Sequence, residues 1–574
     1  MSFIEMVGIA AMMPFMAVVS NPTVILTNKW LQKTYGFFHF DTTRSFLLFL
    51  GILLLVLLLC SNLFKALTVW LTLKYGNRVI YVLARRLLAQ YLCRPYSFFL
   101  NRNTSDMGKN ILAEVRDAID GCFIAGMQVL SNGLVILFIM GMLLAIEPLI
   151  AVTVAVFLGG AYTGLFLLIR HRLTRISKDQ VLAQTMKFKT ATEALGGIKD
   201  IKILGRELLF LKKFAVHAER HSLNNAAAGT ITLLPKYALE VLSLGSILLI
   251  TMYFIGSKND STARMVPLLA VYAFAGYRVL PALQQIFAGI ATVRVNLPVL
   301  ELLIRDLNDE ESNYDPEFIL KNREALQPLP CSRTLELKNI SFCYRAAQEP
   351  VVNDINITIA RNTSIGLVGA TGSGKTTLVD IILGLLTPTA GRMLVDGVEI
   401  SGENLVSWQR NFGYVPQQIY LCDDTITRNI AFGVPDEKID KLDVIRAARI
   451  ANLHGFVEKK LPNGYETIIG ERGVRLSGGQ RQRIGIARAL YEDPAFLIMD
   501  EATNSLDGIT EEAVMEALGA LSGKKTIIMI AHRLTTVKDC DIIYIMEHGR
   551  ITNKGTYEEL QRSSAWFQSA TRHT

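Results

Sequence analysis

Charged residues are scarce in this chain. They make up 19% of its 574 residues, against about 25% in an average soluble protein, while 51% of the residues are hydrophobic. This balance excludes an intrinsically disordered protein and argues against a wholly soluble one. Lys and Arg exceed Asp and Glu by 59 to 51. In so hydrophobic a chain, that excess is more typical of loops on the cytoplasmic side of a membrane than of a nucleic-acid-binding surface.

Cysteine is also sparse, and its positions follow no pattern. The chain has seven cysteines, with no CxxC pair among them, which argues against a disulfide framework and against a zinc site. A reduced, cytoplasmic setting fits this usage best. The first residues lack the basic start and the small-residue cleavage site of a signal peptide, so we interpret them as a membrane span.

Long uncharged runs dominate the first half of the chain. Residues 46–64, 121–146 and 149–169 carry no charge over 19, 26 and 21 residues. An α-helix needs about 20 apolar residues to cross the ~30 Å hydrocarbon layer of a membrane. We therefore predict a transmembrane domain over residues 1–300 with six helices, at about 1–19, 46–73, 121–146, 149–169, 237–257 and 265–293.

Basic residues are concentrated in two of the connections between these spans. Residues 65–120 carry nine Lys and Arg against four acids, and residues 170–236 carry thirteen against five. The positive-inside bias places both segments, and with them both termini, in the cytoplasm. These segments are too long to be turns and contain helix-forming stretches, so we expect the spans to continue as helices into the cytoplasm.

The composition changes after residue 300. Residues 301–330 are rich in charge and end in Pro-Leu-Pro, which is a linker composition. From residue 331 to 574, helical segments alternate with short β-type runs, and this alternation predicts a soluble α/β domain. The expected strands are at 335–343, 364–368, 495–499 and 526–530.

A glycine-rich loop follows the second of these expected strands. The sequence GATGSGKTT at 369–377 lies between that strand and a helical run, which is the strand–GxxxxGK(S/T)–helix arrangement of a phosphate loop. Its backbone N–H groups and the helix N-terminus are suited to bind phosphates, with Lys375 at the β- and γ-phosphates and the Thr376 hydroxyl on Mg²⁺. The predicted nucleotide-binding residues here are Gly369, Thr371, Gly372, Ser373, Gly374, Lys375, Thr376 and Thr377.

Two acidic residues, Asp500 and Glu501, follow the apolar strand expected at 495–499. Asp500 emerges at the carboxyl edge of the predicted parallel sheet, where ligands of such sheets bind. We expect it to bind Mg²⁺ through water, and we expect the adjacent Glu501 to polarise the attacking water.

The sequence LSGGQ at 476–480 supplies a second helix N-terminus suited to bind an anion. One domain then has two phosphate-seeking helix ends that are far apart in sequence. In a head-to-tail dimer, each nucleotide would lie between the phosphate loop of one copy and the LSGGQ helix end of the other. The predicted nucleotide-binding residues of this motif are Ser477, Gly478, Gly479 and Gln480.

With these motifs, the chain resembles the ATP-binding cassette (ABC) family over residues 331–560. Further motifs of that family are SFCY at 341–344, GYVPQ at 413–417, SLD at 505–507 and AHR at 531–533. The fold class that the resemblance implies is a multi-domain membrane protein. A six-helix ABC exporter-type transmembrane domain is followed by an α/β P-loop nucleotide-binding domain. Six spans ahead of one cassette form a half-transporter layout, and residues 98–115 and 193–210 resemble the cytoplasmic coupling regions of exporters.

The resemblance also implies roles for single residues. Tyr344 would stack on the adenine of ATP, and Gln417 would bridge Mg²⁺ and the transmembrane domain. Asp507 would lie at the nucleotide and signal across the dimer, while His532 would hold the γ-phosphate and orient Glu501. Taken alone, these residues fit an ordinary α/β domain, but their positions relative to the other motifs favour the functional interpretation. The intact catalytic set implies an ATP hydrolase coupled to transport, working as a homodimer with ATP and Mg²⁺.

Basic residues inside or beside the predicted spans are candidates for substrate binding, since charges in a membrane are costly. Arg278 interrupts the sixth span, Lys236 starts the fifth and Lys65 ends the second. All three are suited to attract an anionic head group in a central cavity. For Lys65 and Lys236, snorkelling to the cytoplasmic interface is an equally good interpretation.

Four further segments resemble the lipid-linked oligosaccharide flippases of bacterial protein glycosylation pathways: residues 2–15, 23–38, 234–240 and 277–281. This resemblance implies a translocase of the bacterial inner membrane that moves a polyprenyl-diphosphate-linked oligosaccharide, with membrane lipid as a partner, from the cytoplasmic to the outer leaflet. A general ABC exporter of lipids, peptides or drugs is the alternative. A soluble ABC ATPase acting on nucleic acid is disfavoured by the six spans, and a vestigial cassette is disfavoured by the intact catalytic residues.

Overall fold

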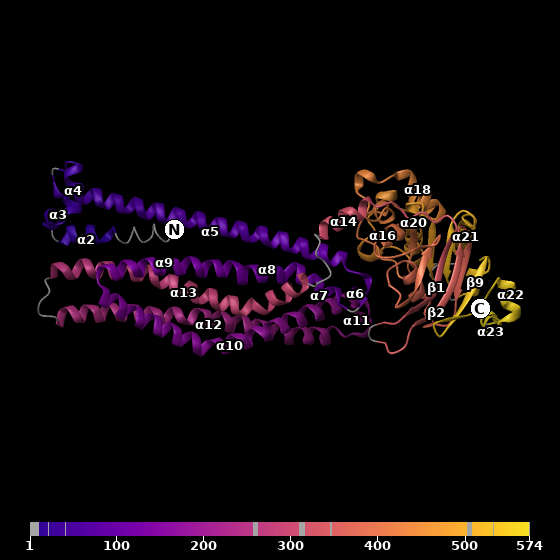
Figure 1. The fold of residues 1–574 in the computed structure, drawn as a ribbon, viewed down its shortest axis with the longest axis horizontal. Helices are drawn as coiled ribbons and strands as arrows, with labels where there is room; N and C mark the ends of the chain where they lie inside the picture. The colour runs from indigo at the N-terminus through magenta and orange to yellow at the C-terminus, as the bar shows by residue number, and fades with distance from the viewer. Residues whose placement is uncertain are drawn as a thin grey trace. The chain divides into compact units, whose positions relative to one another are not determined.

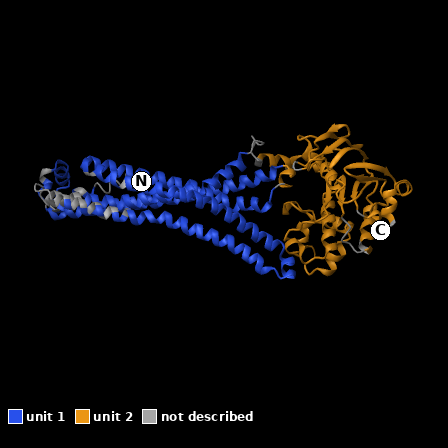
Figure 2. Ribbon diagram, turned by 90° about the horizontal axis from the view of Figure 1, so that it is seen from below, with its two compact units in different colours: residues 1–94, 102–317 blue, residues 95–101, 318–574 orange. Residues whose placement is uncertain are grey.

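The chain divides into two compact units in the computed structural model. Unit 1 comprises residues 1–94 and 102–317, and unit 2 comprises residues 95–101 and 318–574 (Figure 2). Within these spans the structure describes residues 11–20, 22–40, 42–100, 102–256, 262–308, 316–344, 347–501, 508–531 and 533–572.

Unit 1 is built from very long helices that run alongside one another (Figure 1). The longest, α5, has 51 residues and is therefore about 75 Å long at 1.5 Å per residue, more than twice the thickness of a membrane's hydrocarbon core. The expected continuation of the spans as helices is thus confirmed. The long helices are α5 (Thr43–Cys93), α10 (Pro148–Gly196), α12 (Glu207–Gly256) and α13 (Thr262–Leu307).

The third predicted span is one helical rod with two π-helical segments. Its parts are α7 (Thr104–Lys109), η1 (Asn110–Glu114), α8 (Val115–Ala118), η2 (Ile119–Ile124) and α9 (Ala125–Ile146). The first π-helical segment precedes the predicted membrane span at 121–146, and the second overlaps the first residues of that span. Nothing in the sequence signalled them.

Apolar surface on these helices is left uncovered within the chain. Among the described residues, four helices are long and apolar enough to cross a membrane, and at most 28% of the residues in their most apolar stretches are buried. Those helices are Thr43–Cys93, Thr104–Ile146, Ala151–Gly196 and Ala270–Leu307. The first and fifth predicted spans include residues that the structure does not describe. Their described parts are helical: α2 (Met12–Ser20) in the first span and the second half of α12 in the fifth. Six spans therefore remains a prediction.

The segment after α2 forms two short helices, α3 (Val24–Thr27) and α4 (Lys29–Phe37). The Asn28 side chain caps α4 by accepting from the Trp30 N–H at 3.0 Å. One face of α4 buries Leu31, while Trp30 is 82% exposed and Phe37 is 75% exposed. This is the division expected of a helix that lies at a membrane–water interface.

Close helix packing in unit 1 depends on a small residue between α9 and α13. A Cβ at Gly289 would lie 2.5 Å from a methyl of Val129 and 3.1 Å from the Ala125 carbonyl oxygen. The apolar core on these two helices is formed by Val135, Ile139, Leu143, Val271, Ala275 and Val279.

The last helix of unit 1 continues into the segment predicted as a linker. The helix α13 runs to Leu307 because Val299 and Leu303 keep a buried apolar face at helical spacing. A further helix, α14, occupies Pro316–Ala325, with proline at its first position. About half of the predicted linker is thus helical, although its charged residues and prolines predicted irregular structure.

Unit 2 holds two β-sheets. A four-stranded antiparallel sheet has the order β2-β1-β4-β5, and a six-stranded sheet has the order β10-β9-β3-β8-β7-β6. In the larger sheet all neighbours are parallel except β10 against β9. The strands are β1 (Thr334–Phe342), β2 (Val352–Ala360), β3 (Ser364–Val368), β4 (Ala390–Val395), β5 (Val398–Glu399), β6 (Phe412–Val415), β7 (Phe496–Asp500), β8 (Thr526–Ile530), β9 (Ile542–Glu547) and β10 (Arg550–Gly555).

The central strands of the larger sheet are buried on both faces. Every residue of β3, β7 and β8 is buried, as expected for parallel strands covered by helices. Trp408 anchors one side of this core, with its ring edge-on to Phe412 and Phe496 and its indole N–H donated to the Ile382 carbonyl at 2.8 Å. This rigid sheet holds the loops at its strand ends in fixed positions.

Candidate nucleotide-binding site

The phosphate loop joins the buried strand β3 to the helix α15 (Lys375–Ile382). Its first and last glycines, Gly369 and Gly374, have φ angles of 153° and 98°. A Cβ at Gly369 would lie 2.1 Å from the Met546 carbonyl oxygen, and one at Gly374 would lie 2.7 Å from the Val351 carbonyl oxygen. Only glycine fits at both positions, so the backbone can curl tightly ahead of the α15 N-terminus.

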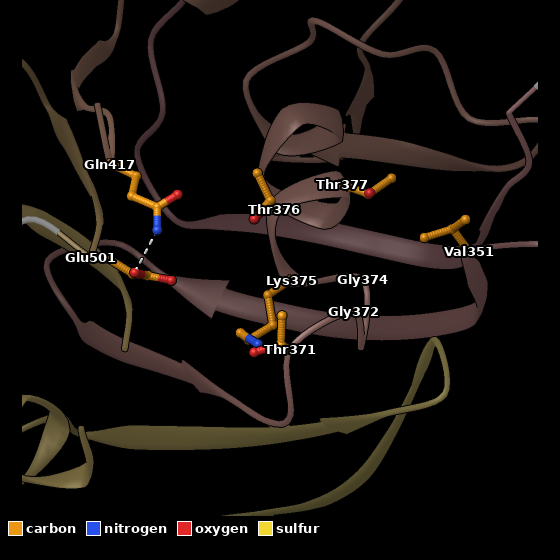
Figure 3. Close-up of a pocket in the computed structure, with 9 residues that line it drawn as sticks. All are labelled: Val351, Thr371, Gly372, Gly374, Lys375, Thr376, Thr377, Gln417 and Glu501. Carbon is orange, nitrogen blue, oxygen red and sulfur yellow. Dashed lines mark hydrogen bonds between the residues drawn. The ribbon is translucent and has the colours of Figure 1, made fainter. Parts of the chain in front are cut away.

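A pocket of about 510 Å³ opens at this loop (Figure 3). Loop amides, an ammonium group and hydroxyls on its wall are the groups that bind a phosphate chain, so the residues present fit a nucleotide. The pocket is lined by Val351, Thr371, Gly372, Gly374, Lys375, Thr376, Thr377, Gln417 and Glu501.

The Lys375 side chain is held inside its own loop. Only 5% of Lys375 is exposed, and its Nζ donates to the carbonyl oxygens of Gly369 and Ala370 at 2.9 Å each and to Ser373 Oγ at 3.4 Å. Burial lowers the pKa of Lys375, and the charges of Glu501 and Asp500 partly oppose this shift. A phosphate oxygen would give this ammonium group a charged partner in place of neutral carbonyls.

Glu501 and Gln417 lie next to each other on one side of the pocket. Gln417 Nε2 donates to Glu501 Oε2 at 2.7 Å (Figure 3). Gln417 follows β6 and Glu501 follows β7, and because these strands are parallel neighbours, their carboxyl ends meet at one edge. Glu501 has a left-handed φ of 51°, which turns it out of the strand, and its N–H donates to the Ile530 carbonyl at 3.1 Å.

Asp500 lies at the end of β7 and is only 5% exposed. A second carboxylate, that of Asp380 on α15, is near it. Burial, together with the charge of Asp500, raises the pKa of Asp380 from 3.8 to about 6. Burial and both carboxylates also raise the pKa of the Tyr414 hydroxyl. Sequence reasoning missed Asp380, because one acid in a helix carries no motif.

Replacing Asp380 should make the protein's stability less dependent on pH. A carboxyl whose pKa is raised in the folded state binds its proton more tightly in the folded protein than in the unfolded chain. The free energy of unfolding therefore falls as the pH rises from 3.8 to 6. Allowing for partial exposure, the wild type should lose about 1 kcal/mol more between pH 5 and 7.5 than Asp380→Asn loses. The thermal midpoint of the variant should therefore rise relative to wild type by roughly 2–4 °C over that interval. Asp423→Asn, at an exposed site, serves as the control, and equal pH dependence in all three proteins would contradict the expectation.

Tyr344 lies beside the pocket rather than among its lining residues. Its hydroxyl is 3.1 Å from Thr377 Oγ1, and its ring is edge-on to Phe342 with centroids 4.9 Å apart. Its ring is thus fixed next to the phosphate loop. Val351, which does line the pocket, was not predicted, and it precedes β2 with no sequence signal of its own.

The LSGGQ segment begins α20 (Gly478–Tyr491), as its sequence predicts. Ser477 is the N-cap: its Oγ accepts from the Gln480 N–H at 3.2 Å, and Gln480 Oε1 accepts from the Ser477 N–H at 2.8 Å. Gly478 and Gly479 fall within the first turn of α20. Among the described residues that line the pocket, none comes from 476–480, so the two phosphate-seeking helix ends are not brought together within one chain.

Two predicted residues, Asp507 and His532, lie outside the described residues. The described part of the chain contains no cluster of three His, Cys, Asp or Glu side chains suited to hold a metal. Thr376 and Gln417 line the pocket, and Asp500 precedes Glu501 at its edge. A hydroxyl, an amide and a carboxylate are oxygen donors suited to Mg²⁺, which commonly completes its shell with phosphate and water.

The basic residues predicted for substrate binding lie on three different helices of unit 1. Lys65 is on α5 and Arg278 is on α13, and both are half-buried, while Lys236 on α12 is exposed and follows Pro235 inside that helix. This placement does not test whether the three residues bind substrate, so that role stays a prediction.

The fold and the pocket define a P-loop ATPase domain joined in one chain to a helical membrane domain. Residues 352–504 match the ABC transporter family, and residues 10–277 match the ABC transporter transmembrane region. The chain belongs to the ABC transporter family, as its motifs predicted, and has the exporter architecture in which hydrolysis of ATP is coupled to transport.

The similar proteins include named flippases. The ATP-dependent lipid A-core flippase of Albidiferax ferrireducens is 29% identical over all of this chain and 95% of its own length. The protein of that name from Saccharophagus degradans is 31% identical over 84% of this chain and 80% of its own. A bacterial Atm1-family ABC exporter with ATP bound has the same fold, with a TM-score of 0.79 at 22% identity over 100% of this chain and 96% of its own.

Proposed function

We propose that the pocket at the phosphate loop binds Mg²⁺-ATP, and that Glu501 is the general base for its hydrolysis. The observation that carries this proposal is the convergence of Lys375, Thr376, Gln417 and Glu501 on one pocket. Lys375 would bind the β- and γ-phosphates, and Thr376, Gln417 and Asp500 would hold Mg²⁺. Tyr344 would stack on the adenine, and Asp507 and His532 would complete the site.

We further propose that the protein works as a head-to-tail homodimer. The pocket as described lacks the LSGGQ segment, and Ser477 at the start of α20 is exposed. A second copy that presents Ser477, Gly478, Gly479 and Gln480 would supply the missing wall. The uncovered apolar faces of the unit 1 helices support a partner copy and surrounding lipid.

The proposed cargo is a lipid that carries phosphate and sugar. The relatives named as lipid A-core flippases support such a lipid, and the basic residues Lys65, Lys236 and Arg278 suit its phosphate groups. Within that class, the sequence resemblance favours a polyprenyl-diphosphate-linked oligosaccharide, whereas the names of these relatives favour a lipid A-core glycolipid. The positive-inside bias supports an orientation with both termini on the cytoplasmic side of a bacterial inner membrane, so movement would run from the cytoplasmic to the outer leaflet. A general exporter of lipids, peptides or drugs remains the alternative.

In liposomes, the cargo class should show itself as stimulation of ATP hydrolysis. A polyprenyl-diphosphate oligosaccharide or a lipid A-core glycolipid should raise the rate, and Arg278→Ala should raise the half-maximal lipid concentration by roughly 10–100-fold through loss of a charge-assisted contact. Lys459→Ala, which replaces an exposed residue of unit 2, serves as the control and should leave the half-maximal lipid concentration unchanged. Which of the two lipids acts at the lower concentration decides between them. Stimulation by drugs or peptides alone would contradict the flippase and favour the general exporter.

A further inference from the structure

Three buried polar side chains and the exposed Arg102 meet where α13 ends, and we call these four residues the Asp306 cluster. The Asp306 carboxylate accepts from the Tyr91 hydroxyl at 2.7 Å, from Asn110 Nδ2 at 3.2 Å and from Arg102 Nη1 at 3.1 Å. Tyr91, Asn110 and Asp306 are 4%, 7% and 8% exposed. A carboxylate so buried, with three donors on its two oxygens, fixes the relative positions of the elements that supply them.

Two members of the Asp306 cluster flank the first covalent connection between the two units, and Asp306 lies on the helix that precedes the second. The chain leaves unit 1 after Arg94, returns at Arg102 and leaves again after Glu317. Tyr91 is on the last turn of α5, before the first crossing, and Arg102 is the first residue after the return. Asp306 is the penultimate residue of α13, beyond which the chain continues to the second crossing.

A neighbouring bond and an irregular helix strengthen this interpretation. Gln90, which is 3% exposed, donates from Nε2 to the Leu307 carbonyl oxygen at 3.2 Å, so two successive residues of α5 hold two successive residues of α13. Asn110 begins the π-helical segment η1. Such π-turns often occur at functional sites, and here one begins at the residue that contacts both Tyr91 and Asp306.

We propose that the Asp306 cluster is the coupling clasp of this transporter: it makes α5 and α13 move as one body when the cassette changes state. The inference rests on the proposed binding of ATP in unit 2. Movement of the cassette reaches unit 1 through the covalent connections at 95–101 and near 317. The Asp306 cluster joins the end of α5 to the end of α13, and each of these helices leads to one of the two connections. A displacement of either connection would therefore move both helices together. Asp306 is thus a positioning residue, and it is not among the described residues that line the nucleotide pocket.

Hydrogen–deuterium exchange of the full-length protein in liposomes tests the clasp without any transport substrate. In the wild type, Mg²⁺-ATP with vanadate should protect phosphate-loop peptides and change exchange along α5 and α13. In Asp306→Asn, which keeps the shape but removes the charge, phosphate-loop protection and basal ATP hydrolysis should persist. The response of α5 and α13 should fall by about threefold or more.

A matched control separates coupling from stability. Ser177 is 1% exposed, and its Oγ donates to the Val295 carbonyl oxygen at 2.6 Å, which ties α10 to α13 away from either connection. Ser177→Ala should lower the thermal midpoint and leave the nucleotide response of α5 and α13 at the wild-type level. Tyr91→Phe should act in the same direction as Asp306→Asn, and the double variant should be no worse than Asp306→Asn alone.

The outcomes are distinct. A wild-type response of α5 and α13 in Asp306→Asn, or a loss of response in Ser177→Ala as large as in Asp306→Asn, would overturn the clasp. If Asp306→Asn does not fold, Tyr91→Phe, which removes one hydroxyl and keeps the ring, is judged by the same criterion. Absence of nucleotide protection at the phosphate loop of the wild type would instead overturn the proposed ATP site.

Discussion

Replacing Glu501 by glutamine should reduce the rate of ATP hydrolysis by roughly 10²–10⁴-fold, the usual contribution of a positioned general base. Glutamine has nearly the same shape, and its carbonyl oxygen can accept the bond that Gln417 Nε2 donates to Glu501 in the native protein at 2.7 Å. The pocket should therefore keep its structure and lose only the carboxylate that takes the proton from the attacking water. Hydrolysis by purified Glu501→Gln in liposomes, measured beside binding of a fluorescent ATP analogue, checks both parts.

The control for this change is Glu492→Gln, an exposed glutamate just after α20. It makes the same chemical substitution in unit 2 outside the pocket, and its hydrolysis rate should equal that of the wild type. If Glu501→Gln keeps more than about a tenth of the wild-type rate while it binds nucleotide normally, Glu501 is not the general base. Loss of nucleotide binding in Glu501→Gln would point to a role in shaping the pocket instead.

Local chemistry explains what the sequence could predict. The runs at 364–368 and 526–530 coincide with β3 and β8, because a short, mostly apolar run between turn signals suits a strand buried on both faces. The phosphate loop was predictable because its conformation requires glycine at fixed positions. Gly369 and Gly374 adopt backbone conformations, and lie so close to neighbouring backbone, that no other residue fits. Each of these features is complete within a few consecutive residues.

Contacts between distant residues account for what the sequence could not predict. The Asp306 cluster joins side chains at 91, 102, 110 and 306, each of which alone is an ordinary polar residue with no motif around it. Asp380 has a raised pKa only because the fold buries it near Asp500. In the linker, charge and proline indicated irregular structure, but α14 forms with Pro316 at its first position, where proline is tolerated. Periodicity and motifs do not encode such pairings.

Replacing Lys375 by methionine should separate nucleotide binding from folding. Charge-assisted hydrogen bonds contribute about 1.5–3 kcal/mol each, so loss of the ammonium group should weaken ATP binding by roughly 100-fold. Without nucleotide, however, the variant should be as stable as the wild type or more stable. Lys375 is buried among neutral carbonyls, and its lowered pKa shows that folding disfavours its charged form.

Thermal unfolding with and without Mg²⁺-ATP measures both effects of Lys375→Met at once. At an ATP concentration about 1,000 times the wild-type Kd, the nucleotide should stabilise the wild type by about 4 kcal/mol and the variant by only about 1.4 kcal/mol. Lys338→Met is the matched control, since Lys338 is exposed on β1 and pairs with Glu336, and its stabilisation by ATP should match that of the wild type. A variant Lys375→Met that is unstable alone yet fully stabilised by ATP would mean that the lysine supports the loop and not the phosphates. Because the two interpretations predict opposite signs for the nucleotide-free protein, one pair of melting curves decides between them.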